Sequence, residues 1–212
     1  MTDRYVPALA FRSLTRLYDP VIRAALPEAR FKELLIDAAR IAPGHRVLDV
    51  GCGTGTLALM IRRACPGATV VGIDGDGEIL AIASGKTSGH VALCRALAHA
   101  LPFARGTFDR VVSSLVFHHL APDRKRDALA AIFGACKPGG ELHIADWGRA
   151  QNVLMRAAYL TVQVFDGFAS TAENVAGKIP SLCEAAGFRE VAETHRRMTA
   201  FGTLSLYRAV RP

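Results

Sequence analysis

The sequence has no apolar run long enough to cross a bilayer, and its first residues lack the basic start and long apolar centre of a signal peptide. It also contains no internal repeat and no low-complexity linker. We therefore expect a cytoplasmic protein, and what remains to be determined is the order in which its helices and strands alternate.

Several catalytic and metal-binding patterns are missing as well. The five cysteines are far apart, with no C-x-x-C pair and no histidine spacing typical of zinc. Neither G-x-S-x-G nor H-E-x-x-H occurs. The sequence therefore predicts no metal site and no nucleophile triad, and it predicts buried thiols in a reducing compartment.

The composition favours one well-filled domain over residues 1–212, because half of the side chains are apolar. The formal charge of +7 is spread over small clusters such as Arg62 with Arg63 and Arg196 with Arg197. Separate doublets are typical of solvated faces. A basic surface would also suit nucleic acid, an anionic substrate or membrane headgroups, and composition does not choose among these.

Short apolar runs alternate with helical spacing along the chain. The expected strands are residues 45–50, 68–74, 90–96, 108–116, 140–147, 189–196 and 202–210, and the expected helices are residues 28–40, 56–64, 76–84, 123–136, 152–168 and 180–188. Asp123 is well placed to cap its helix. The alternation predicts an α/β fold with a doubly wound, seven-stranded, mostly parallel sheet and an antiparallel final strand.

The first predicted strand runs into three glycines, Gly51, Gly53 and Gly55, with only Cys52 and Thr54 between them. Such a bare turn between a strand and a helix lets a ligand touch backbone N–H groups. The spacing is G-x-G-x-G rather than G-x-G-x-x-G, which argues against a pyrophosphate cofactor. Asp74 ends the next strand, where a carboxylate can accept both hydroxyls of an adenosine ribose.

Four segments in this order resemble the class I S-adenosylmethionine-dependent methyltransferases, specifically the small-molecule group that includes the ubiquinone and menaquinone enzymes. They are "VLDVGCGTG", "VVGID", "LPFARGTFDRVVSSLVFHHL" and "KPGGELHIADW". The resemblance implies S-adenosylmethionine as the cofactor. It further implies a set of cofactor-binding residues: Asp49, Gly51, Cys52, Gly53, Gly55, Asp74, Gly75, Leu97, Ala98 and Tyr18, the last in an N-terminal lid.

One segment departs from the family pattern. Where the family carries Gly-Asp-Ala, with a carboxylate that accepts from the adenine amino group, this chain has Ala96, Leu97 and Ala98. Adenine would then depend on backbone N–H groups near Leu97 and Ala98 and on apolar packing, or His99 would compensate.

Three polar residues are candidates for catalysis. We expect His118 and His119 to end the fourth strand, with only one of them facing the cleft, and a histidine there can accept a proton near neutral pH. Asp146 and Trp147 close the fifth strand at the same edge, where they either line the acceptor pocket or pack in the core.

Two segments are expected to cover the site: a helical lid over residues 1–40 and a helical insertion over residues 149–178. The insertion is rich in apolar side chains, which favours a small, largely apolar acceptor such as a quinol, phenol, amine or lipid headgroup. Peripheral membrane contact remains open. A nucleic-acid methyltransferase is less favoured, because "SLVFHHL" stands where base-amino methylases carry N/D-P-P-Y/F. A non-methylating binder of S-adenosylmethionine or a nucleotide is the third alternative.

Overall fold

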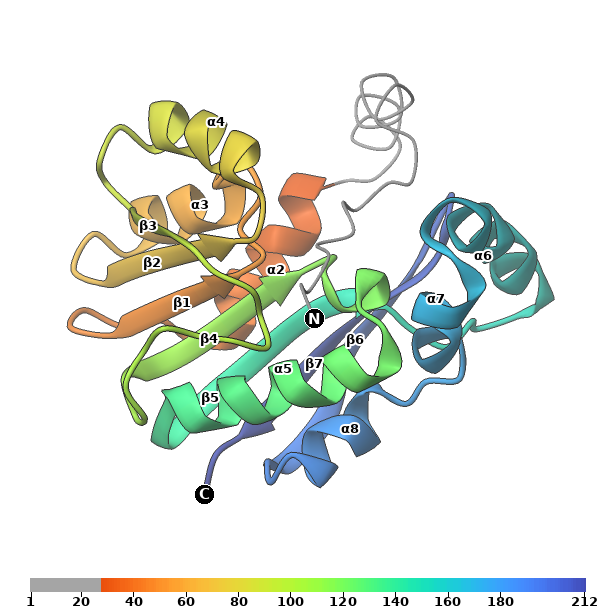
Figure 1. Cartoon of the computed structure of the whole chain (residues 1–212). Helices are drawn as coiled ribbons and strands as arrows, with labels where there is room; N and C mark the ends of the chain where they lie inside the picture. The colour runs from red at the N-terminus through yellow and green to blue at the C-terminus, as the bar shows by residue number, and fades with distance from the viewer. Residues whose placement is uncertain (1–27) are drawn as a thin grey trace, which may run out of the picture.

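Strands and helices alternate through residues 28–212, the part of the chain that the structure, a computed structural model, describes (Figure 1). The strands are β1 (Arg46–Val50), β2 (Thr69–Asp74), β3 (Ala92–Arg95), β4 (Phe108–Ser114), β5 (Cys136–Trp147), β6 (Arg189–Thr199) and β7 (Gly202–Val210). The helices are α2 (Glu28–Ala39), α3 (Thr56–Ala64), α4 (Gly77–Thr87), α5 (Pro122–Ala135), α6 (Val153–Asp166), α7 (Phe168–Val175) and α8 (Ile179–Ala185), and the 3₁₀ turn η1 covers Phe117–His119.

The strands form one seven-stranded sheet in the order β3-β2-β1-β4-β5-β7-β6. β1 to β5 pair in parallel, and β7 is antiparallel to both of its neighbours, β5 and β6. The predicted doubly wound sheet with an antiparallel final strand is confirmed. The strand order reverses between β1 and β4, and a sheet of this kind leaves a crevice at the carboxyl ends of such neighbouring strands.

Helices cover both faces of the sheet (Figure 1). On one face α2 and α3 bury Phe31, Leu35 and Ile61 in a core that continues to α6. On the other face α5 and α8 bury apolar side chains such as Leu129 and Ile132 against β4 and β5. Because β1 is covered on both sides, Val47, Leu48 and Val50 are fully buried, as the continuous apolar run predicts.

One prediction about α6 and one about α5 were wrong. The apolar stretch 152–168 is not one helix, because α6 ends at Asp166. Gly167, whose φ angle is +94°, then turns the chain into α7. Asp123 does not cap α5, since that helix begins at Pro122 after Ala121; Asp123 lies in its first turn. Proline fits a first turn because its missing N–H would have no helical partner there.

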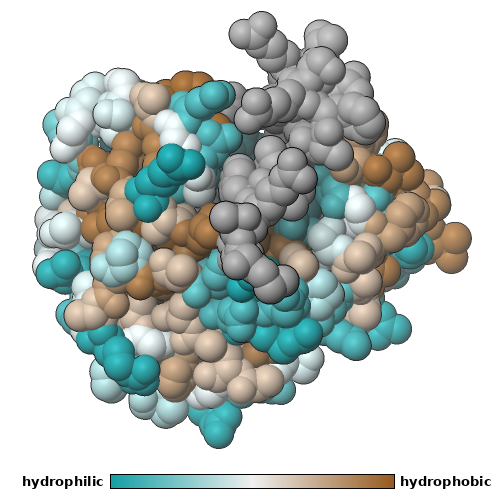
Figure 2. Space-filling view, in the orientation of Figure 1, coloured by the Kyte–Doolittle hydropathy of each residue, from teal (hydrophilic) through white to brown (hydrophobic). Residues whose placement is uncertain are grey.

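The outer face of α6 exposes large apolar side chains. Val153 is 86% exposed and Leu154 is 71% exposed, and Figure 2 shows apolar side chains gathered over this helix at the right-hand edge of the view. Within residues 28–212, no helix combines the length and the apolar character that spanning a membrane requires.

Candidate functional site

A cavity of about 720 Å³ lies at the carboxyl ends of β1, β2 and β4. Eight of the ten predicted cofactor residues line it: Asp49, Gly51, Cys52, Gly53, Asp74, Gly75, Leu97 and Ala98. Gly55 lies behind the wall, where a Cβ atom would press on Ala83 and Thr87 of α4. Tyr18, and most of the predicted lid over residues 1–40, lie outside the described residues.

The glycine turn depends on left-handed backbone at Gly51 and Gly53, whose φ angles are +69° and +53°. A Cβ atom at Gly51 would overlap the side chain of Val116, so the turn packs directly against the segment that follows β4. At Gly53 a Cβ atom would meet nothing within 4 Å. The backbone is therefore bare on the cavity side, as the sequence predicted.

Asp74 connects this turn to β2. One carboxylate oxygen, Oδ2, accepts from the N–H of Gly53 at 3.0 Å, and the other, Oδ1, accepts from the N–H of Asp76 at 3.0 Å. Asp76, not Asp74, is the N-cap of α4. Each carboxylate oxygen has a second lone pair, so Asp74 retains acceptors for hydroxyl groups of a ligand in the cavity.

Asp49 is 1% exposed and lies on the cavity wall, and its Oδ2 atom has no hydrogen-bond partner. Burial raises the pKa of this carboxyl to about 7, against the opposing effects of the Lys32 ammonium and the N–H of Ala58. Lys32 belongs to α2, lines the same cavity and donates to Glu28 at 2.5 Å. A buried carboxylate with a free acceptor beside a cation suits a ligand end that carries both a positive and a negative charge.

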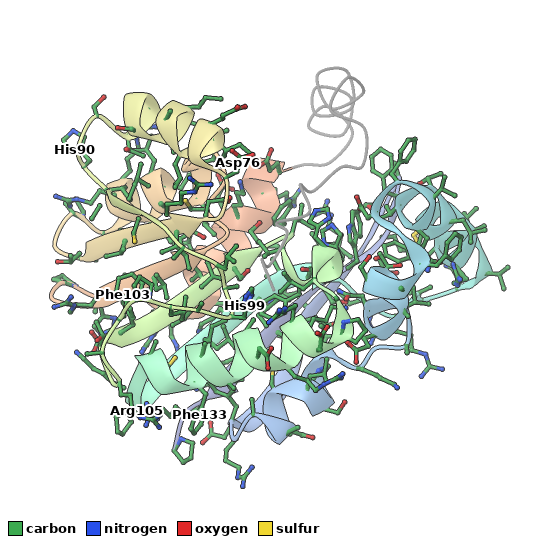
Figure 3. The ribbon with its side chains drawn as sticks, viewed as in Figure 1. Asp76, His90, His99, Phe103, Arg105 and Phe133 are labelled. Carbon is green, nitrogen blue, oxygen red and sulfur yellow. The ribbon has the colours of Figure 1, made fainter. Side chains whose placement is uncertain are left out.

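The loop after β3 forms another part of the wall. Ala96 anchors it by donating its N–H to the carbonyl of Asp74 at 3.0 Å. Leu97, Ala98 and His99 follow on the cavity wall, and Figure 3 labels His99 on this loop. The wall here is largely apolar, and it includes His99, the polar side chain that was one of the two expected replacements for the missing acid.

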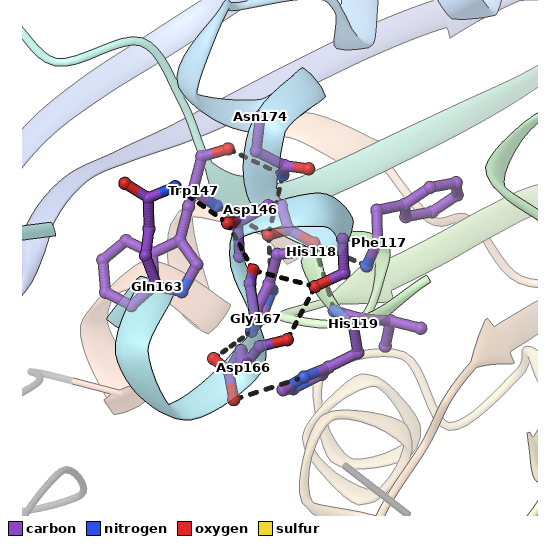
Figure 4. Close-up of polar contacts among 12 residues, drawn as sticks. Phe117, His118, His119, Asp146, Trp147, Gln163, Asp166, Gly167 and Asn174 are labelled. Carbon is purple, nitrogen blue, oxygen red and sulfur yellow. Dashed lines mark hydrogen bonds and ion pairs between the residues drawn. The ribbon is translucent and has the colours of Figure 1, made fainter. Parts of the chain in front are cut away.

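His118 and His119 do not end a strand, so that expectation was wrong. β4 ends at Ser114, and Leu115, a non-glycine residue with φ at +57°, turns the chain into η1. In a 3₁₀ turn successive side chains do not alternate between two faces as they do in a strand. Both imidazole rings consequently approach the same carboxylate, that of Asp166 (Figure 4).

Asp146 lies behind His118 and is fully buried. Its oxygens accept from the N–H groups of Val116, Phe117 and Trp147, and its Oδ1 lies 2.7 Å from Nδ1 of His118. Although burial opposes ionisation, His118 and the hydrogen bonds lower the pKa of Asp146. Asp146 therefore holds His118 and the turn in place. Trp147 is also buried, and its ring packs 5.6 Å from that of Tyr159 in α6.

Asp166 and Lys32 line the cavity but were missed by sequence reasoning. Asp166 is the last residue of α6, and its carboxylate lies 3.6 Å from Nδ1 of His119. Burial raises the pKa of Asp166 to about 6, and burial lowers that of His119 to about 3, with a further contribution from His118. One signal was present in the sequence: Asp166 is the only acidic residue in the apolar stretch 152–168.

Comparisons with known proteins identify relatives of this chain. The family described as "Methyltransferase domain" matches residues 47–140. An uncharacterized methyltransferase of Synechocystis is 30% identical over 185 residues, which cover 86% of this chain and 83% of the relative. A demethylmenaquinone methyltransferase of Thermus thermophilus is 37% identical over 123 residues, which cover 57% of this chain and 55% of the relative, so that match spans about half of the Thermus protein.

The fold is also that of a solved structure. A SAM-dependent methyltransferase from Aquifex aeolicus superposes with a TM-score of 0.69, covering 99% of this chain and all of that one, at 19% sequence identity. At that identity the likeness concerns the fold alone.

Proposed function

Because the chain belongs to the class I S-adenosylmethionine-dependent methyltransferases, in the group that is like the quinone methyltransferases, we propose that its cavity binds S-adenosylmethionine beside a small, largely apolar acceptor. The observation that carries the cofactor assignment is the unpartnered, buried Oδ2 of Asp49 on the cavity wall. An ammonium group there would supply the missing donor.

Different residues around the cavity would bind different parts of the cofactor. Asp49 and Lys32 would hold the charged amino-acid end, with the bare backbone at Gly53 beside them. Asp74 would accept from the ribose hydroxyls with its remaining lone pairs, and Leu97 and Ala98 would pack on the adenine. When bound, S-adenosylmethionine supplies an electrophilic methyl group on a sulfonium centre.

The protein's own task is then to align the acceptor and to keep water out. Positioning of this kind can supply roughly 7 to 11 kcal/mol of a reaction barrier. Leu115, Leu120 and Ala169 give the far part of the wall an apolar character, and α6 and α7 would cover it as the predicted insertion over residues 149–178. His119 and Asp166 lie on that part of the wall together with Arg124 and Ser170, and their imidazole and carboxylate make them candidates to orient an acceptor's hydroxyl or amine.

Transfer of labelled methyl groups tests this proposal. The full chain is incubated with methyl-labelled S-adenosylmethionine in three separate reactions, which contain a quinone extract, a lipid extract or RNA as the acceptor. Label in the quinone or lipid fraction is the expected result. Label in RNA alone would favour the nucleic-acid alternative, and binding of S-adenosylhomocysteine without transfer to any fraction would favour a non-methylating role.

A further inference from the structure

Three metal-ligating side chains meet at the acceptor end of the cavity. Nε2 of His118 lies 3.5 Å from Oδ2 of Asp166, and Nδ1 of His119 lies 3.6 Å from Oδ1 of the same carboxylate. One ligand atom from each residue can be chosen so that all lie within 4.8 Å of one another (Figure 4). The fold creates this cluster by placing the end of α6 against η1.

The spacing fits an ion better than direct hydrogen bonds. Both separations exceed the usual range of N–H···O bonds, which ends at about 3.2 Å. Zinc binds imidazole nitrogen and carboxylate oxygen at about 2.0 to 2.2 Å, so two ligands on a tetrahedron stand roughly 3.3 to 3.6 Å apart. Each imidazole nitrogen stands at such a distance from one oxygen of the Asp166 carboxylate, 3.5 Å from Nε2 of His118 to Oδ2 and 3.6 Å from Nδ1 of His119 to Oδ1.

The orientation of His118 points the same way. The Asp146 carboxylate accepts from three backbone N–H groups, and an ionised carboxylate can only accept hydrogen bonds. Nδ1 of His118 is therefore the donor in the 2.7 Å contact with Asp146. That hydrogen bond fixes the tautomer and turns the lone pair of Nε2 toward Asp166. A carboxylate that orients a metal-binding histidine through its second ring nitrogen is a recurring feature of metal sites.

The cluster is closed on one side and open on the other. The His118 side chain is 4% exposed and that of Asp166 is 5% exposed, whereas the His119 side chain is 28% exposed. His119 and Asp166 line the cavity. Three protein ligands with a remaining position facing a cavity are typical of catalytic rather than structural metal sites.

We propose that His118, His119 and Asp166 bind one divalent transition-metal ion, zinc or a similar ion, with its open coordination position facing the acceptor. Two imidazoles and one carboxylate suit such ions better than magnesium or calcium, which prefer oxygen ligands. This site is not evident from the sequence, which predicted no metal. The binding of the ion is independent of the proposed function. Its role, to hold an oxygen or nitrogen atom of the acceptor, rests on that function.

Titration with metal ions tests the proposal. The full chain is stripped with a chelator and titrated with Co²⁺, whose visible absorption reports coordination, and then with Zn²⁺ as the competitor. We expect one equivalent per chain. His119→Ala and Asp166→Asn should each weaken binding at least tenfold, and Asp146→Asn should weaken it about 10- to 100-fold through the orientation of His118.

His90→Ala is the matched control, because His90 is an exposed histidine in the loop that follows α4 (Figure 3), and its replacement should leave the affinity unchanged. Circular dichroism and thermal unfolding confirm that each variant is folded, and Asp166→Asn keeps the shape of the side chain. Absence of saturable binding, or equal affinity in wild type, His119→Ala and Asp166→Asn, would overturn the site. Because no cofactor is present in this titration, its failure leaves the proposed function intact, and failure to bind S-adenosylhomocysteine leaves the metal site intact.

Discussion

Asp49 has an unusual electrostatic position, because it is an acidic side chain within a fully covered strand. Its pKa is raised from 3.8 to about 7, so the native state binds a proton that the unfolded state has already released between these values. Stability contributed by the protonated form is therefore complete below about pH 4 and is lost as the pH rises through 7.

Replacement of Asp49 removes this dependence. When the pH rises from 5 to 8, wild type loses the stability that the protonated carboxyl contributes and Asp49→Asn does not. We therefore expect the free energy of unfolding of Asp49→Asn to rise by about 2 to 3 kcal/mol relative to that of wild type over this interval, since each pKa unit is worth 1.36 kcal/mol. Urea denaturation of both proteins at the two pH values measures the difference. A difference that does not change with pH would show that Asp49 ionises normally in the native state.

Alanine substitutions at Gly51 and Gly53 separate the cost of a left-handed backbone from the cost of steric overlap. Gly53→Ala incurs only the left-handed backbone, about 1 to 2 kcal/mol, because its Cβ atom would meet nothing within 4 Å. Gly51→Ala adds an overlap with Val116, worth roughly 1 to 3 kcal/mol more. Chemical denaturation should rank the two variants in this order, and the reverse order would contradict the packing of the glycine turn on the segment after β4.

At the scale of elements, α6 is held to the sheet by a small number of buried side chains. Tyr159 is 3% exposed and packs on Trp147, whereas its neighbour Leu160 is 43% exposed. The helix thus has one anchored face and one apolar face toward solvent. If α6 covers the acceptor, its anchoring and the affinity for the acceptor should change together.

We therefore expect Tyr159→Ala to cost roughly 3 to 5 kcal/mol, as large-to-small changes at buried aromatic positions do, and to raise the KM for the acceptor. Leu160→Ala, one residue along the helix, should change stability by about 0.5 kcal/mol or less. Unfolding experiments and amide exchange in α6 provide the comparison. Equal effects of the two substitutions would mean that Tyr159 does not anchor the helix.

Elements differ in how far the sequence could predict them. β1, β2 and β4 are buried on both faces, so their apolar runs carry enough local signal, and a cap such as Asp76 lies next to the helix it begins. The turn after β4 was misjudged because the positive φ of Leu115 and the shape of η1 depend on Asp146, a residue far along the chain. Periodicity does not register such distant contacts.

The candidate site likewise contains residues that the sequence could predict and residues that it could not. Residues of the glycine turn and Asp74 follow directly from strand ends, so their convergence at one edge of a parallel sheet is predictable. Asp166 reaches the site only because Gly167 ends α6 there and α7 packs against η1. A lone acid in an apolar helix was the available signal, and its partners could be identified only from the fold.

At the scale of the whole molecule, the sheet order places the candidate ligand-binding groups from β1, β2 and the segment after β4 around one cavity. In the proposed arrangement the amino-acid end of the cofactor would lie at Asp49 and its sugar at Asp74, while the acceptor would lie toward His119. We therefore expect recognition of the nucleoside to depend most on Asp74.

Calorimetric titration of the full chain with S-adenosylhomocysteine tests that arrangement most directly. We expect one equivalent bound by wild type, no comparable binding of NAD, and a loss of at least tenfold in affinity for Asp74→Ala. Asp76→Ala is the control: it removes the N-cap of α4, at about 1 kcal/mol of stability, without touching the cavity wall. Tight binding of NAD without S-adenosylhomocysteine, or unchanged affinity in Asp74→Ala, would contradict the account.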